Sequence, residues 1–346
     1  MSQTPAKPGC NGRGNVIGVV AKIRGRLENK LAPAMGHGHR PVPIAVCECN
    51  AWKGFMIEAM YPDATRIRVR PGQPAEEILN ALPRDTRGVV MHLDASVTSD
   101  FLANDGDFRA DLAARGVRTI NIDATDIRKS TIHARCSAVG LPMARADRDG
   151  PGDERVIIKT TLNSGGGPEH KLARQWGASA ARVAADVSDV VRGSLDYVIC
   201  RRDEVPAAVW TDSKFVVERF IENPEGVFFR VYVVGPAGVV SAAWTDRQIK
   251  KLSMPIRARE NYYYWTGANG HTALGSSSES ATRALTVARR LAESLNVELC
   301  GADCVMDTSG NVVPIDINKT PYWGKPRTSP ILAHLLHGFD HLMNVP

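Results

Sequence analysis

The sequence contains no long hydrophobic run and no signal-peptide pattern. No apolar stretch approaches the length of about 18 residues that a membrane-spanning helix needs. The N-terminus, MSQTPAKPGCNGRGN, lacks the apolar core of a signal peptide. We therefore expect a cytoplasmic protein that does not associate with membranes.

Paired cysteine motifs are missing as well. The chain has seven cysteines, an odd number. Neither Cys47-x-Cys49 nor Cys300-x₃-Cys304 is accompanied by a second pair at zinc-finger spacing. We therefore expect reduced thiols in the core rather than disulfides or a zinc site.

The chain also lacks a long basic run, although its net charge is +6. Lysine and arginine are scattered and are not interleaved with aromatic residues, so we expect no nucleic-acid partner. Attraction to a phosphorylated nucleotide or to an acidic small molecule explains the positive charge equally well.

What the sequence does contain is a regular alternation of strand-like and helix-like segments. Its 346 residues are enough for two or three compact units. Residues 1–14 are rich in proline and glycine and are expected to form a flexible tail. Residues 15–125 predict an α/β domain with an open, mostly parallel sheet. The expected strands are Val16–Ala21, Pro43–Glu48, Thr65–Val69, Gly88–Leu93 and Arg118–Ile122, with helices at Ala75–Leu82 and Asp107–Ala114.

Acidic residues lie within an apolar hairpin near the C-terminus, in the segment Gly301–Pro321. Asp303 lies on the first strand, and Asp316 and Asn318 lie two apart on the second, so they share a face. Strand pairing across the turn brings Asp303 beside them. Three such oxygen donors suit Mg²⁺, which takes phosphates and water as further ligands. The alternative is a surface hairpin with solvated carboxylates.

Two lysines precede this hairpin in positions that suit phosphate binding. Lys129 begins a helix that ends before Gly140, and Lys159 ends the apolar strand Arg155–Lys159. The glycine-rich run Ser164–Gly167 follows, where backbone N–H groups can approach phosphate oxygens without obstruction by side chains. A surface lysine and a plain flexible turn are the alternatives. The spacing is not that of a Walker loop.

A further apolar strand, Lys214–Ile221, leads into a hinge. Its backbone can bond an adenine edge while apolar side chains cover the ring. Glu218 and Glu225 lie seven residues apart around this hinge. Solvated glutamates are the alternative. Between the glycine run and this strand we expect a helix around Ala178–Val191 and a strand at Tyr197–Cys200.

In this order and at this spacing, the motifs of residues 126–325 resemble the ATP-grasp superfamily. The resemblance implies two α+β lobes, residues 126–213 and 214–346, that hold ATP and Mg²⁺ between them. Two magnesium ions are expected, and Mn²⁺ could replace them. The resemblance implies these contacts: Lys129 and Lys159 with phosphates, Ser164, Gly165, Gly166 and Gly167 as a lid, Glu218, Phe220 and Ile221 with adenine, Glu225 with ribose, and Asp303, Asp316 and Asn318 with metal.

Basic residues that suit an acidic substrate follow the hinge. Arg230 lies between Phe228 and Tyr232 on one face of the strand Gly226–Val234. The loop-like stretch Trp244–Ala268 holds five more cations. From them we expect Lys250 or Lys251, and Arg257 or Arg259, to contact the γ-phosphate or the substrate together with Arg230. A solvated charge on the sheet and an exposed basic loop are the alternatives.

The activity that the resemblance implies first is that of a carboxylate–amine ligase, which works through an acyl phosphate and releases ADP and phosphate. Small-molecule carboxylates and amines are then the substrates, and a homodimer is compatible with the resemblance. The alternative is a small-molecule kinase that phosphorylates a hydroxyl of a polyol or sugar-like substrate. Asp316 and the strand GVFFRVYVV resemble the inositol-phosphate kinases of the superfamily more than most of its ligases.

Overall fold

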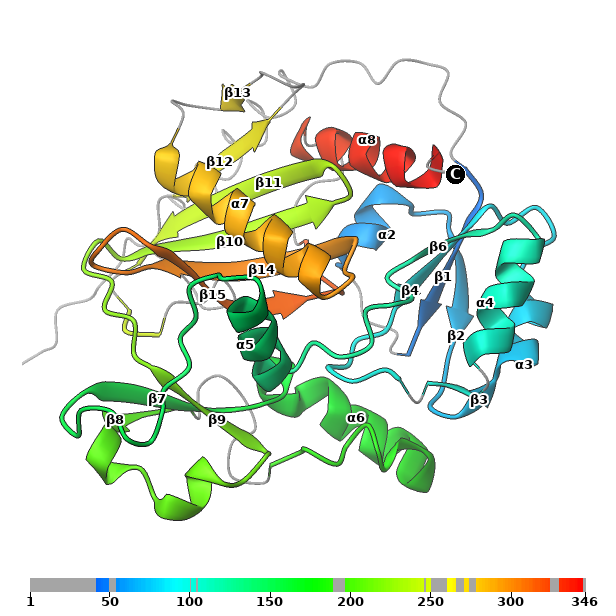
Figure 1. Ribbon diagram of the computed structural model, residues 1–346. Helices are drawn as coiled ribbons and strands as arrows, with labels where there is room; N and C mark the ends of the chain where they lie inside the picture. Colours follow the sequence, from blue (N-terminus) through cyan, green and yellow to red (C-terminus); the bar gives the residue numbers. More distant parts are fainter. Residues whose placement is uncertain are drawn as a thin grey trace, which may run out of the picture.

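The computed structural model describes most of the chain, and Figure 1 shows how its parts are arranged. It describes residues 42–49, 54–99, 101–103, 105–188, 197–245, 247–249, 260–265, 271–273, 278–323 and 330–344. The expected tail and the strand Val16–Ala21 lie outside these residues. Three sheets of different size make up the described fold, together with a two-strand pair, β3 and β5.

The first sheet is parallel, as the alternation of strands and helices predicts. Its strand order is β2-β1-β4-β6. One face packs on α3 and α4 and the other on α2 and α8, so β1 and β4 are apolar up to their last residues, Glu48 and His92. The bounds are β1 Ile44–Glu48, α2 Met56–Met60, β2 Thr65–Arg68, β3 Gln73–Pro74, α3 Ala75–Ala81, β4 Gly88–His92, β5 Leu102–Ala103, α4 Asp105–Ala114 and β6 Arg118–Ile120.

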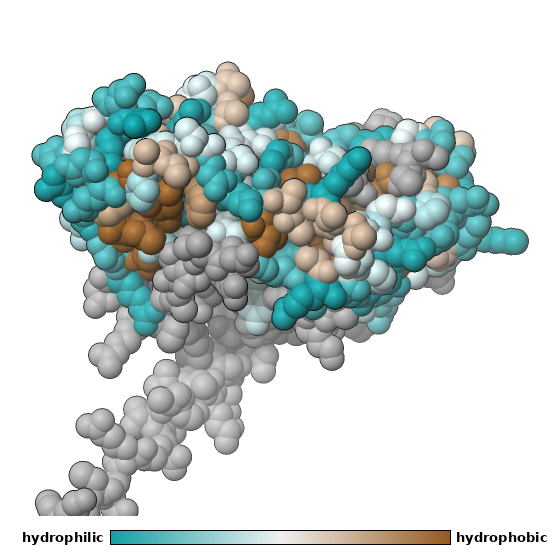
Figure 2. Space-filling model, turned by 90° about the horizontal axis from the view of Figure 1, so that it is seen from below, coloured by the Kyte–Doolittle hydropathy of each residue, from teal (hydrophilic) through white to brown (hydrophobic). Residues whose placement is uncertain are grey.

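The second sheet has three antiparallel strands in the order β8-β7-β9. Its strands are β7 Arg155–Thr160, β8 Val198–Arg201 and β9 Phe215–Arg219. The helix α5, Lys129–Ala138, precedes it. Strand β9 pairs with β7 although it lies beyond residue 213, where we expected the first lobe to end. Hydrophobic side chains on this side of the molecule lie among hydrophilic ones in Figure 2, and Val198 of β8 is 47% exposed.

The helix after β7 lies earlier than predicted. The expected helix around Ala178–Val191 is wrong, because α6 runs from Gly167 to Trp176. Pro168 stands at its start, where a missing N–H costs nothing. Gly177, with φ of +52°, ends the α-helix, and only a 3₁₀ turn, Gly177–Ala180, follows it directly. The glycine run is therefore continuous with a helix.

The third sheet has six antiparallel strands in the order β13-β12-β11-β10-β14-β15. Helices α5 and α7 pack on one face, and α8 packs on the other face against β10, β11 and α2 (Figure 1). The expected loop Trp244–Ala268 is wrong in part, because β12 pairs with β11 within it. The bounds are β10 Val227–Val234, β11 Ala237–Trp244, β12 Glu260–Trp265, β13 His271–Ala273, α7 Glu279–Ser294, β14 Leu299–Met306, β15 Val312–Asn318 and α8 Pro330–Asn344.

The described cysteines agree with the expectation of reduced thiols. Six cysteines are free thiols, and all of these except the half-buried Cys200 are buried. None of the described helices is both long enough and apolar enough to cross a membrane.

Candidate nucleotide and metal site

Lys129 lies at the junction of the three sheets. It is the first residue of α5, and only 1% of it is exposed. Its Nζ donates to the Leu162 carbonyl at 3.0 Å and to Asn163 Oδ1 at 3.4 Å, and it lies 3.8 Å from Asp316 Oδ2. The surface-lysine alternative is therefore wrong. A buried ammonium held mainly by neutral oxygens is well suited to an anionic ligand.

Lys159 and Glu218 form a buried ion pair across β7 and β9. Lys159 Nζ donates to Glu218 Oε2, and His133 Nε2 lies 3.1 Å from Glu218 Oε1. Burial alone would raise the pKa of Glu218, but Lys159 and His133 lower it to about 2. Burial would likewise lower the pKa of Lys159, and Glu218 raises it instead. Both groups are therefore charged at neutral pH. Because Glu218 is only 1% exposed, the alternative of a solvated glutamate is wrong at this position.

The glycine run forms a compact turn between β7 and α6. Ser164, Gly165 and Gly166 all have positive φ, at 50°, 68° and 75°, a backbone conformation that favours glycine. Asn163 fixes the start of this turn: its N–H donates to Ser96 Oγ at 2.9 Å, and its Nδ2 donates to the Ile317 carbonyl at 2.6 Å. The turn is therefore bonded both to the first sheet's loops and to the hairpin.

The hairpin has the register that the sequence predicts. Asp303 lies opposite Asp316, and Gly301 lies opposite Asn318, with a bulge between Asp303 and Cys304. Asp303 is buried, so a fully solvated hairpin is excluded. Asn318 Oδ1 accepts the Thr320 N–H at 2.8 Å, which fixes the orientation of the amide.

Arg230 lies directly opposite Asp303 on β10. Its Nε is 2.5 Å from Asp303 Oδ1, and its Nη2 donates to Oδ2 at 3.2 Å. A Cβ at Gly301 would lie 3.0 Å from Pro321 Cβ, which is a tight contact, and 3.4 Å from Arg230 Nη1, which is an ordinary one. Burial lowers the pKa of Arg230, but Asp303 raises it above its ordinary value. A solvated arginine on the sheet face is therefore excluded.

These oxygen donors fit one magnesium ion that is shared with a polyphosphate. The described residues contain no cluster of three His, Cys, Asp or Glu side chains. The hairpin would supply three oxygens to the ion, one each from Asp303, Asp316 and Asn318. Phosphates and water would complete the coordination shell of the magnesium. Any ion on Asp303 would compete with Arg230 for that carboxylate, and the number of ions remains a prediction.

Two apolar clusters flank the hinge after β9. One, on the three-stranded sheet, contains Phe220; the other, on the six-stranded sheet, contains Ile221. The Phe220 N–H already donates to the Arg155 carbonyl at 2.9 Å. Glu225 is exposed in the turn before β10. The members of the two clusters are Ile157, Tyr197, Ile199, Phe215, Phe220 and Ile249, and Ala144, Ile221, Phe228, Val305, Val313 and Ile315.

Several predicted site residues cannot be placed. Lys250, Lys251, Arg257 and Arg259 lie outside the described residues. Their contacts with phosphate or substrate remain predictions.

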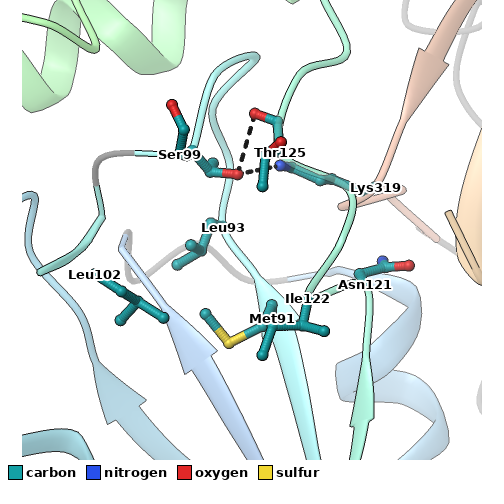
Figure 3. A pocket seen from close by; sticks show the side chains of 9 residues that line it. Met91, Leu93, Ser99, Leu102, Asn121, Ile122, Thr125 and Lys319 are labelled. Atoms are coloured by element: carbon teal, nitrogen blue, oxygen red, sulfur yellow. Dashed lines mark hydrogen bonds between the residues drawn. The ribbon is translucent and has the colours of Figure 1, made fainter. Parts of the chain in front are cut away.

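Sequence reasoning missed Lys319, which is 2% exposed. Its Nζ donates to Thr98 Oγ at 2.7 Å and to the Ala124 carbonyl at 2.6 Å. Burial lowers its pKa to about 7. It borders a cavity of about 20 Å³ at the carboxyl ends of β4 and β6 (Figure 3). Lys319 therefore connects the end of the hairpin to the loops of the first sheet. No local sequence pattern indicates a contact between residues so far apart in the chain.

His133 and Asn163 were also missed. His133 follows Lys129 by one helical turn, so both residues lie on one side of α5. That spacing was the one available signal for His133. Asn163 acts through partners 67 and 154 residues away, which no local pattern indicates.

No protein-family model and no curated protein matches this sequence. The fold is similar to the ATP-grasp ligase PsnB complexed with minimal precursor, at 14% identity, with 87% of this chain and all of that chain covered and a TM-score of 0.49. It is also similar to D-alanine–D-alanine ligase from Bacillus anthracis complexed with ATP, at 10% identity, 88% and 97% coverage and a TM-score of 0.46.

A third similar structure is L-amino acid ligase from Bacillus licheniformis, at 12% identity, with 82% of this chain and 68% of that chain covered and a TM-score of 0.43. The chain is thus structurally similar to ATP-grasp ligases. At these identities and TM-scores, the reaction has to be inferred from the chain's own residues.

Proposed function

We propose that this protein is an ATP-dependent carboxylate–amine ligase. The observation that carries the proposal is the convergence of the buried Lys129 with the acidic face of the hairpin, 3.8 Å from Asp316. A cationic group and oxygen donors that face one space suit a metal-bound polyphosphate. We also propose a cytoplasmic location, small-molecule substrates and a homodimer.

The buried cations would bind the phosphates. Lys129 and Lys159 neutralise the charge that develops on the transferring γ-phosphoryl group. Glu218 holds Lys159 in its charged form before the nucleotide arrives. Asp303, Asp316 and Asn318 would hold Mg²⁺, which supplies Lewis-acid stabilisation of the phosphate oxygens. Ser164–Gly167 would cover the phosphates and exclude water from the reactive product.

The nucleoside would lie between the two apolar clusters at the hinge. Phe220 and Ile221 bring one cluster to each side of the adenine ring. We place Glu225 on the ribose hydroxyls, where its exposed carboxylate is free to accept hydrogen bonds.

The reaction then has two steps. A substrate carboxylate oxygen forms a bond to the γ-phosphorus while the bond to the β-phosphate oxygen breaks, which gives an acyl phosphate and ADP. An amine nitrogen next bonds to the acyl carbon, the carbon–oxygen bond to phosphate breaks, and the proton of the amine is released to solvent. Arg230 is near enough to the hairpin to bind the carboxylate or the phosphate that leaves.

A kinase is the second candidate, because Asp316 stands where most ligases of the superfamily have glutamate. In that reaction a hydroxyl oxygen replaces the carboxylate, and the phosphoryl group stays on the product. No amine is then required.

Phosphorus NMR of ATP turnover with Mg²⁺ tests the proposal. The purified protein is given amino acids and other carboxylates in one sample, and polyols and sugars in another. The ligase predicts ADP and an equal amount of inorganic phosphate that depend on both a carboxylate and an amine. ADP with a new phosphomonoester signal would establish the kinase instead.

A pair of variants on the hairpin links this turnover to the metal site. Asp316→Asn should abolish turnover, because it removes a charged oxygen from the metal. Asp307→Asn is the matched control, since Asp307 lies at the turn of the same hairpin and bonds only locally in the described structure. Equal activity of the two variants would contradict the metal assignment.

A further inference from the structure

The carboxyl ends of β1 and β4 lie at the edge of the first sheet that meets the end of the hairpin, where Thr320 bonds Asp94. The chain passes from β1 to β2 on one side and later returns to β4 on the other, so these two strands flank the switch point of the described sheet. Ligands of open α/β sheets bind outside the carboxyl ends of the strands at such a point. Asp94 follows β4 at this edge and is half-buried.

A second carboxylate, that of Glu169 on α6, lies near Asp94, because it bonds Ser96 two residues further along the chain. Glu169 is fully buried, with 0% of it exposed. Its Oε1 accepts the Ser96 N–H at 2.7 Å, whereas its Oε2 is buried and has no hydrogen-bond partner among the residues that the structure describes. Burial raises the pKa of Glu169, and the nearby charge of Asp94 raises it further. An acceptor oxygen left unpaired in the interior is costly unless a ligand supplies its donor.

Asp94 is connected to the predicted metal ligand by one hydroxyl group. Thr320 Oγ1 lies 3.0 Å from Asp94 Oδ1 and 2.9 Å from Asn318 Oδ1. A group bound between the two carboxylates would therefore lie next to the place where the acyl phosphate forms.

The lysines near these carboxylates do not complete the pairing of Glu169. Lys171 and Lys319 lower the pKa of Asp94, but burial raises it more. Lys319 directs its Nζ to Thr98 and Ala124 instead, on the side of the small cavity (Figure 3). Ser96 supplies the hydrogen bonds that the Glu169 carboxylate receives, and Oε2 has no further donor among the described residues.

We propose that Asp94 and Glu169 form a subsite that binds the ammonium group of the amine substrate. The inference rests on the proposed ligase function and adds the class of its second substrate: a primary amine that arrives as a cation. Two carboxylates supply the charge that an alkylammonium requires. Glu169 Oε2 accepts one of its N–H groups and takes up that proton, so that the neutral nitrogen can then attack the acyl carbon.

Two nucleophiles of similar size and different charge test this subsite. Hydroxylamine is neutral at neutral pH, whereas methylamine is a cation. The full-length protein is given ATP, Mg²⁺, a pool of amino acids and dicarboxylic acids, and one of the two nucleophiles. Mass spectrometry then measures the hydroxamate or the N-methylamide, and ADP is measured in both.

The variants are Asp94→Asn and Glu169→Gln, each of which keeps the shape and removes the charge. Asp123→Asn is the control, because this exposed carboxylate lies on the same edge of the sheet beyond β6. Both test variants should lose at least about tenfold in methylamide formation, the loss expected for one charged hydrogen bond. Hydroxamate formation should stay within about twofold of the wild type, and the control should lose neither.

The outcomes separate the subsite from the ligase. An equal fall of both products, or an unchanged yield of methylamide, would refute the subsite. A wild type that forms hydroxamate but no methylamide would also refute it while the ligase stands. A wild type that forms neither product and releases no ADP would refute the ligase, and the subsite with it.

Discussion

Glu218→Gln should destabilise the protein by about 3 to 5 kcal/mol, because it leaves the buried Lys159 beside a neutral amide. Glu218 is 1% exposed and Lys159 is 7% exposed, so water cannot replace the lost charge. Lys159 can avoid being an unpaired buried charge by losing its proton. The roughly 3.5 pH units between pH 7 and its ordinary pKa of 10.5, at about 1.36 kcal/mol each, limit the cost to about 5 kcal/mol.

The loss of this proton makes the stability of the variant depend on pH, which can be measured. A lysine that is neutral when folded and charged when unfolded binds fewer protons in the folded state, so stability rises with pH. Urea unfolding of Glu218→Gln should therefore show the free energy increasing from pH 7 to pH 9 by up to about 1.4 kcal/mol per unit relative to wild type. The double variant Glu218→Gln/Lys159→Met should abolish this increase.

The matched control is Glu222→Gln, just beyond the same strand. Glu222 pairs with Arg155 at 2.7 Å, but both side chains are about half exposed. Its loss should cost less than about 1 kcal/mol. If Glu218→Gln were as mild as this control, with no difference in pH dependence from wild type, the buried ion pair would be refuted.

Three further predictions concern phosphate binding, the ribose contact and acid stability. Lys129→Met should lower kcat/KM for ATP at least about a hundredfold while the thermal unfolding of the protein stays cooperative; a change below threefold would contradict its role. Glu225→Ala should raise KM for ATP more than it lowers kcat, and an unchanged KM would mean that the ribose contact is misplaced. Burial holds the pKa of His92 at about 3, below its ordinary 6.5, so the unfolded state takes up the proton first and stability falls as the pH falls below 6.5. His92→Leu should therefore gain about 2 kcal/mol over wild type between pH 7 and pH 5 in denaturant unfolding, and a constant difference would refute the neutral buried histidine.

Elements with a local physical cause could be predicted from the sequence. Strands β1 and β4 are buried on both faces, so they read as short, continuous apolar runs. The facing of Asp303 and Asp316 could be predicted, because period-two alternation and a glycine-containing turn fix which side chains share a face, whereas the bulge after Asp303 could not. Asp303 and Asp316 are opposite each other for that reason.

Elements fixed by distant partners could not be predicted. Strand β9 joins the three-stranded sheet because it pairs with β7, about sixty residues earlier, and no local pattern assigns a strand to one sheet or another. The start of α6 was hidden by three glycines, which usually indicate a loop. The pairing of His133 with Glu218 spans 85 residues, and that of Asp94 with Thr320 spans 226.

Asn163 shows why the candidate site depends on the whole fold and not on any one motif. Its backbone N–H binds Ser96 of the first sheet's loops, its Nδ2 binds the Ile317 carbonyl of the hairpin, and its Oδ1 accepts from Lys129. Three separate units thus meet at one buried side chain. Any movement that opened the glycine turn away from the hairpin would break at least the bond to Ile317 and would also remove a partner of Lys129. If Lys129 binds phosphate as we propose, opening of the turn would loosen this lysine at the same time, and we expect nucleotide entry to depend on the position of the turn.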